Sequence, residues 1–508
     1  MKYQSVVFAL LLSALTARAA LPQPDLLAQI HFAGAQKISA DPHSQAFTNE
    51  FCSAEALALR AQTAAKLAGW LAGWLRTNSN ATVADGPAKL RPLFDDLQTS
   101  EWFLEARTAA GGKPEVAVAI RLDPARAQLW QASLIAFLPS ASFKNTGGWL
   151  IFDSNPALLN LGNRLAQELA VPPAGWLDLD INWPLLAQWH PLLKELALPE
   201  THFSLTAPDN NFRVNGKFFF AQNLALNLEP WRVPTNTIRQ PFDSFTAARG
   251  FAAWLPAQTW TQPFQITPTP NQLFAWSLPS FPFQTYAAVP VPDSARALSQ
   301  INAELEPSVA TADALQRFIA PVKPELTNNE IVFGGMPFVA LKLRALSEPA
   351  GQFLMLELFP NSARSRPLQT QIFSALAVNN LVYYHWELTA VRMSQLLQIS
   401  QYALMFTRHK QLDAMSAGFR WLQRIGPTLG NNDTEIVQSG PAEFTFTRKS
   451  PGIFTAPELY TLANWLEATN FPGFNLNLPP HPMRPLLKPQ PQFRLITPQA
   501  LPGPAPGH

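Results

Sequence analysis

The stretches EVAVAIRLDPARAQLWQASLIAFL (residues 115–138) and QTYAAVPVPDSARALSQINAEL (residues 284–305) decide the fold. In each, an apolar strand pattern ends at an Asp and continues as a helix pattern. Asp123 and Asp293 are the predicted N-caps, because a carboxylate there accepts backbone N–H groups of the first helical turn. The residues Asp-x-Ala-Arg-Ala recur at a constant offset of 170, which predicts an internal repeat.

The same order of elements surrounds both stretches. A hairpin partner strand precedes each one, and a strand, a helix and a further strand pair follow it. The matching strands are predicted at 101–107, 176–181, 202–206 and 212–220 in the first half, and at 272–278, 381–387, 435–438 and 443–448 in the second. This order predicts an α+β fold of two similar halves with largely antiparallel sheets and packed helices. The alternative is coincidence among Ala- and Leu-rich segments.

The remaining segments complete a predicted domain plan. Leu67, Trp70, Leu71, Trp74 and Leu75 form an apolar stripe at helical spacing and predict an N-terminal helix over 53–75 that packs on the core. Prolines crowd the C-terminus and predict an extended tail. The plan is a signal peptide at 1–19, a mainly helical segment at 20–99, a first α+β repeat at 100–228, a connecting segment at 229–269, a second repeat with an insertion at 270–470, and a Pro-rich disordered tail at 471–508.

The N-terminus has the three parts of a secretory signal peptide. Lys2 supplies the positive charge, residues 6–15 (VVFALLLSAL) form the apolar core, and Ala17-Arg18-Ala19 is a small-x-small cleavage site. We expect cleavage after Ala19 and an extracytoplasmic location, periplasmic or secreted. The apolar core is too short for a typical transmembrane helix, and no transmembrane segment is expected in the mature chain.

Charge and cysteine content narrow the classes of partner. The predicted leader contains Lys2 and Arg18 and no acid, so its removal leaves 35 basic and 35 acidic residues. A neutral chain has no net attraction to nucleic acid, and no nucleic-acid partner is expected. Cys52 is the only cysteine and cannot form an intrachain disulfide; we expect it to be buried and inert. An envelope protein partner remains open.

Four stretches carry a family resemblance. They are EPWRVPTN (229–236), SFTAARG (244–250), PNQLFAW (270–276) and NLVYYHWE (380–387). In these stretches the chain resembles a family of exported bacterial proteins with no assigned activity. The resemblance supports export and one shared architecture over most of the mature chain, and it implies no reaction.

Catalytic motifs are absent from the sequence, and no cofactor is predicted. The best candidate cluster combines Asp178 and Asp180 with His385 and Glu387, because predicted caps at Asn182 and Thr389 would make their strands equivalent. Two carboxylates and an imidazole could divide the roles of acid and base. The alternative is a solvated strand face, and the alternation of Leu and Asp over 177–181 favours it.

A weaker candidate is a metal pair of His409 and Asp413, four residues apart on a predicted helix. A solvated face flanked by Arg408 and Lys410 is the simpler interpretation. Three functions remain open. The favoured one is a non-catalytic binding or assembly module of the cell envelope. The others are an extracytoplasmic hydrolase that uses the carboxylate–histidine cluster, and a carrier of an apolar ligand, which 35 Phe against 6 Tyr would suit.

Overall fold

The structure is a computed structural model. It describes residues 25–473 except for 80–84, 110–113, 158, 170–174, 189–192, 194–197, 239–240, 258–265, 280–283, 312–322, 335–340, 360–369 and 407–414. The described strands are β1 (Leu26–Phe32), β2 (Trp102–Thr108), β3 (Pro114–Arg121), β4 (Ser142–Thr146), β5 (Trp149–Asp153), β6 (Leu177–Ile181), β7 (Glu200–Thr206), β8 (Phe212–Phe219), β9 (Ser244–Arg249), β10 (Gln272–Ser277), β11 (Thr285–Val291), β12 (Lys323–Thr327), β13 (Glu330–Gly334), β14 (Leu341–Glu348), β15 (Gly351–Leu358), β16 (Leu381–Leu388), β17 (Asn431–Gly440) and β18 (Glu443–Ser450).

The described helices fall between and after these strands. They are α2 (Ala35–Ser39), α3 (Gln45–Phe51), α4 (Ala54–Ser79), α5 (Gly86–Thr99), α6 (Pro124–Ile135), α7 (Leu161–Glu168), α8 (Trp183–Leu186), α10 (Ser294–Thr311), α11 (Thr370–Ala375), α12 (Thr389–Phe406), α13 (Ala417–Ile425) and α14 (Ala456–Glu467), with short 3-10 turns η1 (Leu255–Ala257) and η3 (Gly426–Thr428). Helices and antiparallel strands together confirm the predicted α+β class.

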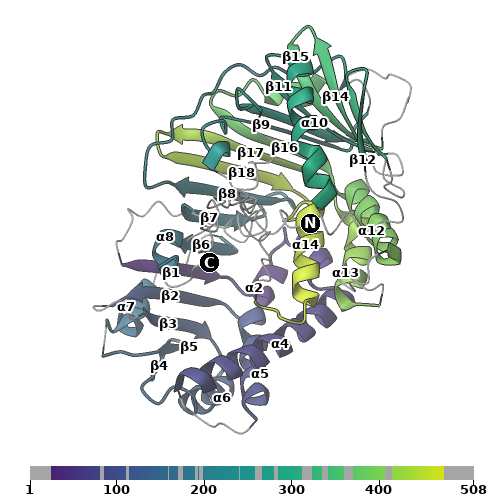
Figure 1. The fold of residues 1–508 in the computed structure, drawn as a ribbon. Coiled ribbons are helices and arrows are strands. Elements are labelled where there is room, and N and C mark those ends of the chain that lie inside the picture. Colours follow the sequence, from purple (N-terminus) through teal and green to yellow (C-terminus); the bar gives the residue numbers. More distant parts are fainter. Residues whose placement is uncertain are drawn as a thin grey trace, which may run out of the picture.

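All 18 described strands belong to one antiparallel sheet, which rises from β4 at the bottom of Figure 1 to β14 and β15 at the top. The pairings give the order β4-β5-β3-β2-β1-β6-β7-β8-β18-β17-β16-β9-β10-β11-β15-β14-β13-β12. Outward from the central β8–β18 pair, each side has the same chain connections. The sheet is therefore built from two similar halves, and β12 and β13 are an addition to the second.

The equivalent helices begin at the predicted caps. The Asp123 carboxylate accepts the backbone N–H of Arg126 at 2.9 Å, and the Asp293 carboxylate accepts that of Arg296 at 3.0 Å. In each half the capped helix follows the strand that the repeat assigns to it, because α6 follows β3 and α10 follows β11. The two caps fall at equivalent helix starts.

The halves join through the equivalent strands β8 and β18, which pair in antiparallel fashion from Phe212 opposite Ser450 to Phe219 opposite Glu443. Pairing of equivalent strands is the arrangement of an isologous two-fold interface, here within one chain. Gly216 lies at the middle of this seam, where the ring of Phe203 occupies the space that a Cβ would need. Phe203 also packs edge-on against Phe446 at 5.3 Å between ring centroids, so aromatic side chains seal the join.

The two faces of the sheet differ. The helical face carries Phe203 and Phe446, and α2 and α3 pack on its centre. Helices α4, α5 and α6 cover this face in the first half and α10 covers it in the second. The opposite face, here called the carboxylate face, carries Asp178 and Asp180. Helix α7 covers its outer part in the first half. Figure 1 shows α4 and α12 to α14 gathered on one side of the sheet and α7 and α8 on the other.

Three sequence expectations differ from the structure. Strands β1 and β9 begin the two halves, yet both lie outside the repeat boundaries predicted at 100 and 270. The predicted N-terminal helix is α4, but its buried side is formed mainly by alanines, and Trp70 and Trp74 are half exposed. Cys52 is partly exposed rather than buried. The predicted signal peptide and most of the predicted tail lie outside the described residues.

Candidate functional site

His202 on β7 lies between two carboxylates of the carboxylate face. Its Nδ1 is 2.5 Å from Oδ1 of Asp180 on β6, and its Nε2 is 3.2 Å from Oε1 of Glu200. Burial alone would lower the pKa of His202, but hydrogen bonds to Asp180 and Glu200 and their negative charges raise it to about 9. His202 is therefore cationic at neutral pH, with both ring nitrogens engaged.

His31 on β1 has the same kind of surroundings. Its Nε2 is 3.3 Å from Oε1 of Glu101 and its Nδ1 is 3.4 Å from Oδ2 of Asp178, while its ring stacks on Phe103. Burial would lower the pKa of His31, but these two carboxylates raise it. Burial would also raise the pKa of Glu101, yet hydrogen bonds from His31 and Lys37 and nearby positive charge lower it to about 2. Each buried charge has an opposite partner.

These contacts define what the carboxylate face can do. A general base must be unprotonated at the working pH, and an imidazolium held between two carboxylates is a weak candidate for that role. The same ion pairs join β1, β6 and β7, which are neighbours in the sheet. Asp178 and Asp180 therefore bind two histidines and hold strands together. They are mostly buried and paired, which differs from the solvated strand face that the sequence favours.

His385 and Glu387 lie on the helical face. Residues paired across an antiparallel sheet share a face, and the pairs from Asp178 run through Ser204, Asn215, Thr447 and Glu435 to Tyr384. His385 is the next residue along β16 and so points the other way. The predicted four-residue cluster is wrong for two reasons. Asp178 and Asp180 lie on the opposite face of the sheet from His385 and Glu387, and four strands, β7, β8, β18 and β17, lie between β6 and β16.

On the helical face, His385 and Glu387 have a local structural role. Nε2 of His385 is 3.4 Å from Oε2 of Glu387, and Oε1 of Glu387 accepts the backbone N–H of Ala456 at 2.7 Å. Burial would raise the pKa of Glu387, but His385 and the backbone of Ala456 lower it. The positive end of the α14 helix dipole stabilises an ionised carboxylate at its first turn. The other predicted pair, His409 and Asp413, lies outside the described residues.

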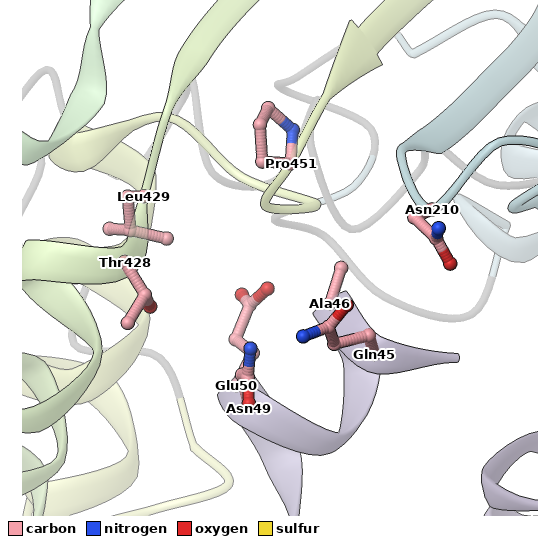
Figure 2. A pocket seen from close by; sticks show the side chains of 8 residues that line it. All are labelled: Gln45, Ala46, Asn49, Glu50, Asn210, Thr428, Leu429 and Pro451. Atoms are coloured by element: carbon pink, nitrogen blue, oxygen red, sulfur yellow. The ribbon is translucent and has the colours of Figure 1, made fainter. Parts of the chain in front are cut away.

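A pocket of about 150 Å³ lies where α3, the β7–β8 turn, η3 and the end of β18 approach each other. Figure 2 shows Glu50 reaching from α3 into the space between Leu429 on one side and Ala46 and Asn210 on the other, with Pro451 above. The lining residues are Gln45, Ala46, Asn49, Glu50, Asn210, Thr428, Leu429 and Pro451. Glu50 is the only charged residue of this lining.

Glu50 differs from the other buried acids in lacking a partner. It is 2% exposed, and neither carboxyl oxygen has a hydrogen-bond partner of ordinary geometry among the described residues. Burial raises the pKa of Glu50 to about 8, and the backbone N–H of Ile453 offsets only part of this effect. Its backbone is fixed, because Nε1–H of Trp421 donates to the Glu50 carbonyl at 2.7 Å. The carboxyl group is thus held in place, buried and without a charged partner among the described residues.

A second cavity, of about 210 Å³, lies on the carboxylate face in the second half, between Trp276, Tyr286 and Met355. Its charged residues Arg344 and Glu357 form an ion pair at 2.7 Å. The charged residues of the second cavity are therefore paired with each other, whereas the carboxyl group in the Glu50 pocket has no charged partner in the lining. Within the part of the chain that the structure describes, no three His, Cys, Asp or Glu side chains are placed to hold a metal ion.

Sequence reasoning missed the Glu50 pocket, although one signal was present. Ala46, Phe47, Glu50 and Phe51 share a helical face by their spacing, so an acid interrupts an apolar stripe. A charge in such a position is buried only with a partner or a ligand. The pocket itself could not be foreseen, because its walls come from residues near 46, 210, 428 and 451.

The fold and the pocket define an α+β protein with a duplicated antiparallel sheet and one unmatched buried carboxyl group. In comparisons with family models, with curated proteins and with solved structures, nothing matches this chain. None of the described helices combines the length and the apolar character needed to cross a membrane.

Proposed function

We propose that this protein is a non-catalytic binding module of the cell envelope and that the Glu50 pocket is its recognition site. The observation that carries the proposal is the carboxyl group of Glu50, which is 2% exposed, faces the pocket and has no side-chain hydrogen-bond partner among the described residues. An unsatisfied buried carboxyl group costs about 1–3 kcal/mol or more, which a protein recovers when a ligand completes the site.

Two features favour binding over catalysis. The pocket lining offers a single acid and no imidazole, thiol or amine that could act with it. On the carboxylate face, His202 is already held as a cation by Asp180 and Glu200, and both ring nitrogens of His31 already contact carboxylates. We propose export by cleavage after Ala19, and membership of the exported family stays a prediction. N-terminal sequencing of the mature protein from the cell envelope tests export, which is wrong if Lys2 is retained.

The test of the binding function is a thermal-shift screen of small amines, alcohols, sugars and organic acids against the full chain and Thr428→Trp. Thr428 is exposed at the pocket wall, so a tryptophan there is expected to fill the pocket without disturbing the core. We expect at least one compound that stabilises the unmodified protein and has no effect on Thr428→Trp. If every stabilising compound acts equally on both proteins, the proposed recognition site is wrong.

A further inference from the structure

We propose that the Glu50 pocket binds a small organic ammonium ion, with the carboxylate of Glu50 as its counter-charge. This inference rests on the proposed function and adds the chemical class of the ligand. It starts from the charge of the lining, in which Glu50 has no cation and no second acid beside it. A buried carboxylate attracts a cation strongly and repels an anion, because water no longer screens its charge.

The described residues around the Glu50 carboxyl group have no ionisable side chain. Gln45, Asn49 and Ala46 face it from α3, Asn210 from the β7–β8 turn, and Thr428, Leu429 and Pro451 from the other wall, and none of these side chains ionises. Apart from burial, only the backbone N–H of Ile453 shifts the pKa of Glu50. Among the described residues, no cation of the lining is placed to balance the Glu50 carboxylate when it ionises, so a ligand could supply that charge.

The polar groups of the lining suit an ammonium ion better than a metal ion. An ammonium group has three N–H donors, and Glu50, the amide oxygens of Asn49 and Asn210 and the hydroxyl of Thr428 are acceptors in the lining. Calcium sites use about six to eight oxygen ligands, often from several carboxylates, and magnesium requires a nearly ideal octahedron of oxygen ligands. With one carboxylate, this pocket neutralises a single positive charge.

The size and the apolar wall indicate a short alkyl stem on the ammonium group. Leu429, Pro451 and Ala46 provide carbon surface opposite the polar residues. The cavity volume of about 150 Å³ corresponds to about five water-sized groups, at roughly 30 Å³ each. n-Butylammonium, with about five non-hydrogen atoms, is therefore a fitting probe.

The inference predicts a pH dependence with a definite sign. In the free protein Glu50 has a pKa of about 8, so its carboxyl group is mostly protonated at pH 7 and mostly ionised at pH 9. An ammonium ion binds the ionised form, so its affinity should rise about tenfold from pH 7 to pH 9, while the amine itself is still protonated. Binding at pH 7 should release close to one proton for each ligand bound.

The experiment is isothermal titration calorimetry of the full chain with n-butylammonium, n-pentanol, butyrate and tetramethylammonium. We expect n-butylammonium to bind at least tenfold more tightly than the neutral and anionic probes. Tetramethylammonium should bind weakly because it has the charge and no N–H donor. Glu50→Gln and Thr428→Trp should each weaken n-butylammonium at least tenfold. Glu55→Gln, on α4 outside the lining, is the matched control and should leave binding unchanged.

Two results would overturn the inference, and they separate it from the proposed function. The first result is that n-pentanol or butyrate binds as tightly as n-butylammonium, and that this binding is kept in Glu50→Gln and lost in Thr428→Trp. The pocket is then a binding site for another class of ligand. The ammonium inference then fails and the proposed function stands. If Thr428→Trp changes the binding of none of the probes in the calorimetry or of the compounds in the screen, both fail.

Discussion

The Glu50 pocket and the carboxylate face both bury acids, yet the two regions treat charge in opposite ways. On the carboxylate face, Asp178, Asp180 and Glu101 each contact a histidine. In the pocket, Glu50 contacts no cation among the residues that the structure describes. Buried charges that are paired with opposite charges hold neighbouring strands together. A buried carboxyl group without such a partner lowers the stability of the protein when no ligand is bound. The proposed binding site therefore rests on the single unpaired acid, and the dense cluster of ionisable groups is assigned a structural role.

The first prediction concerns Glu50→Gln, which should raise stability in alkaline solution. A raised carboxyl pKa means that the folded state holds the proton more tightly, so stability is greatest below the unfolded-state pKa and is lost as pH rises through about 8. The loss amounts to at most about 5 kcal/mol at pH 9, since one pKa unit corresponds to about 1.4 kcal/mol. The Glu50→Gln variant has no ionisable group at this position, so it should not lose this stability as the pH rises.

Urea unfolding of the unmodified protein and Glu50→Gln at pH 5 and pH 9 measures this effect. We expect similar stability at pH 5 and a clear advantage for the variant at pH 9. Glu55→Gln again serves as the control, because Glu55 is only partly buried and lies on α4 outside the pocket lining. Equal slopes of stability against pH for all three proteins would show that Glu50 is solvated or paired.

The second prediction concerns Asp180→Asn on the matched side of the comparison. The raised pKa of His202 gives stability that is fully present below about 6.5 and is lost as pH rises through about 9. Removal of the Asp180 charge should cost about 2–3 kcal/mol at pH 6 and almost nothing at pH 10. The His202 pKa, followed by NMR, should fall. A pKa that stays near 9 in the variant would assign the shift to Glu200 alone.

The third and smallest effect is expected for Glu101→Gln. The pKa of Glu101 is lowered to about 2, so its stabilising contribution is present above the unfolded-state value and is lost as pH falls. Lys37 and Arg121, which share this carboxylate, are more than half exposed, and solvent screening limits the effect to about 1–2 kcal/mol at pH 6. Thermal unfolding at pH 6 and pH 2 should show a much larger loss at pH 6, because the contribution disappears only as pH falls through about 2; an equal loss at both would indicate packing rather than charge.

Local sequence patterns predicted much of the fold. The caps Asp123 and Asp293 and the strand-to-helix transitions around them depend on neighbouring residues, and they lie where the sequence indicates. Strand β1 was missed because helices α2 to α5 separate it from its partner β2. Its pairing depends on contacts far along the chain, which periodicity does not contain.

The candidate site was less accessible to prediction. The order of strands in the sheet places β7, β8, β18 and β17 between Asp178 and His385, and the register places the two residues on opposite faces. The histidines that do contact Asp178 and Asp180 are His31 and His202, from strands that only the sheet order brings together. The Glu50 pocket needs four chain segments at once. Its composition became visible only in three dimensions.

The measurement that tests the central claim most directly is the pKa of Glu50 itself, followed by carbon-13 NMR of glutamate carboxyl groups and assigned with Glu50→Gln. We predict a carboxyl signal that titrates near pH 8 in the free protein and shifts to lower pH when n-butylammonium is added. The shift should be absent in Thr428→Trp. A Glu50 signal that titrates near the ordinary glutamate pKa of about 4.5, with or without the amine, would contradict the claim that Glu50 is an unpaired buried carboxyl group that binds a cationic ligand.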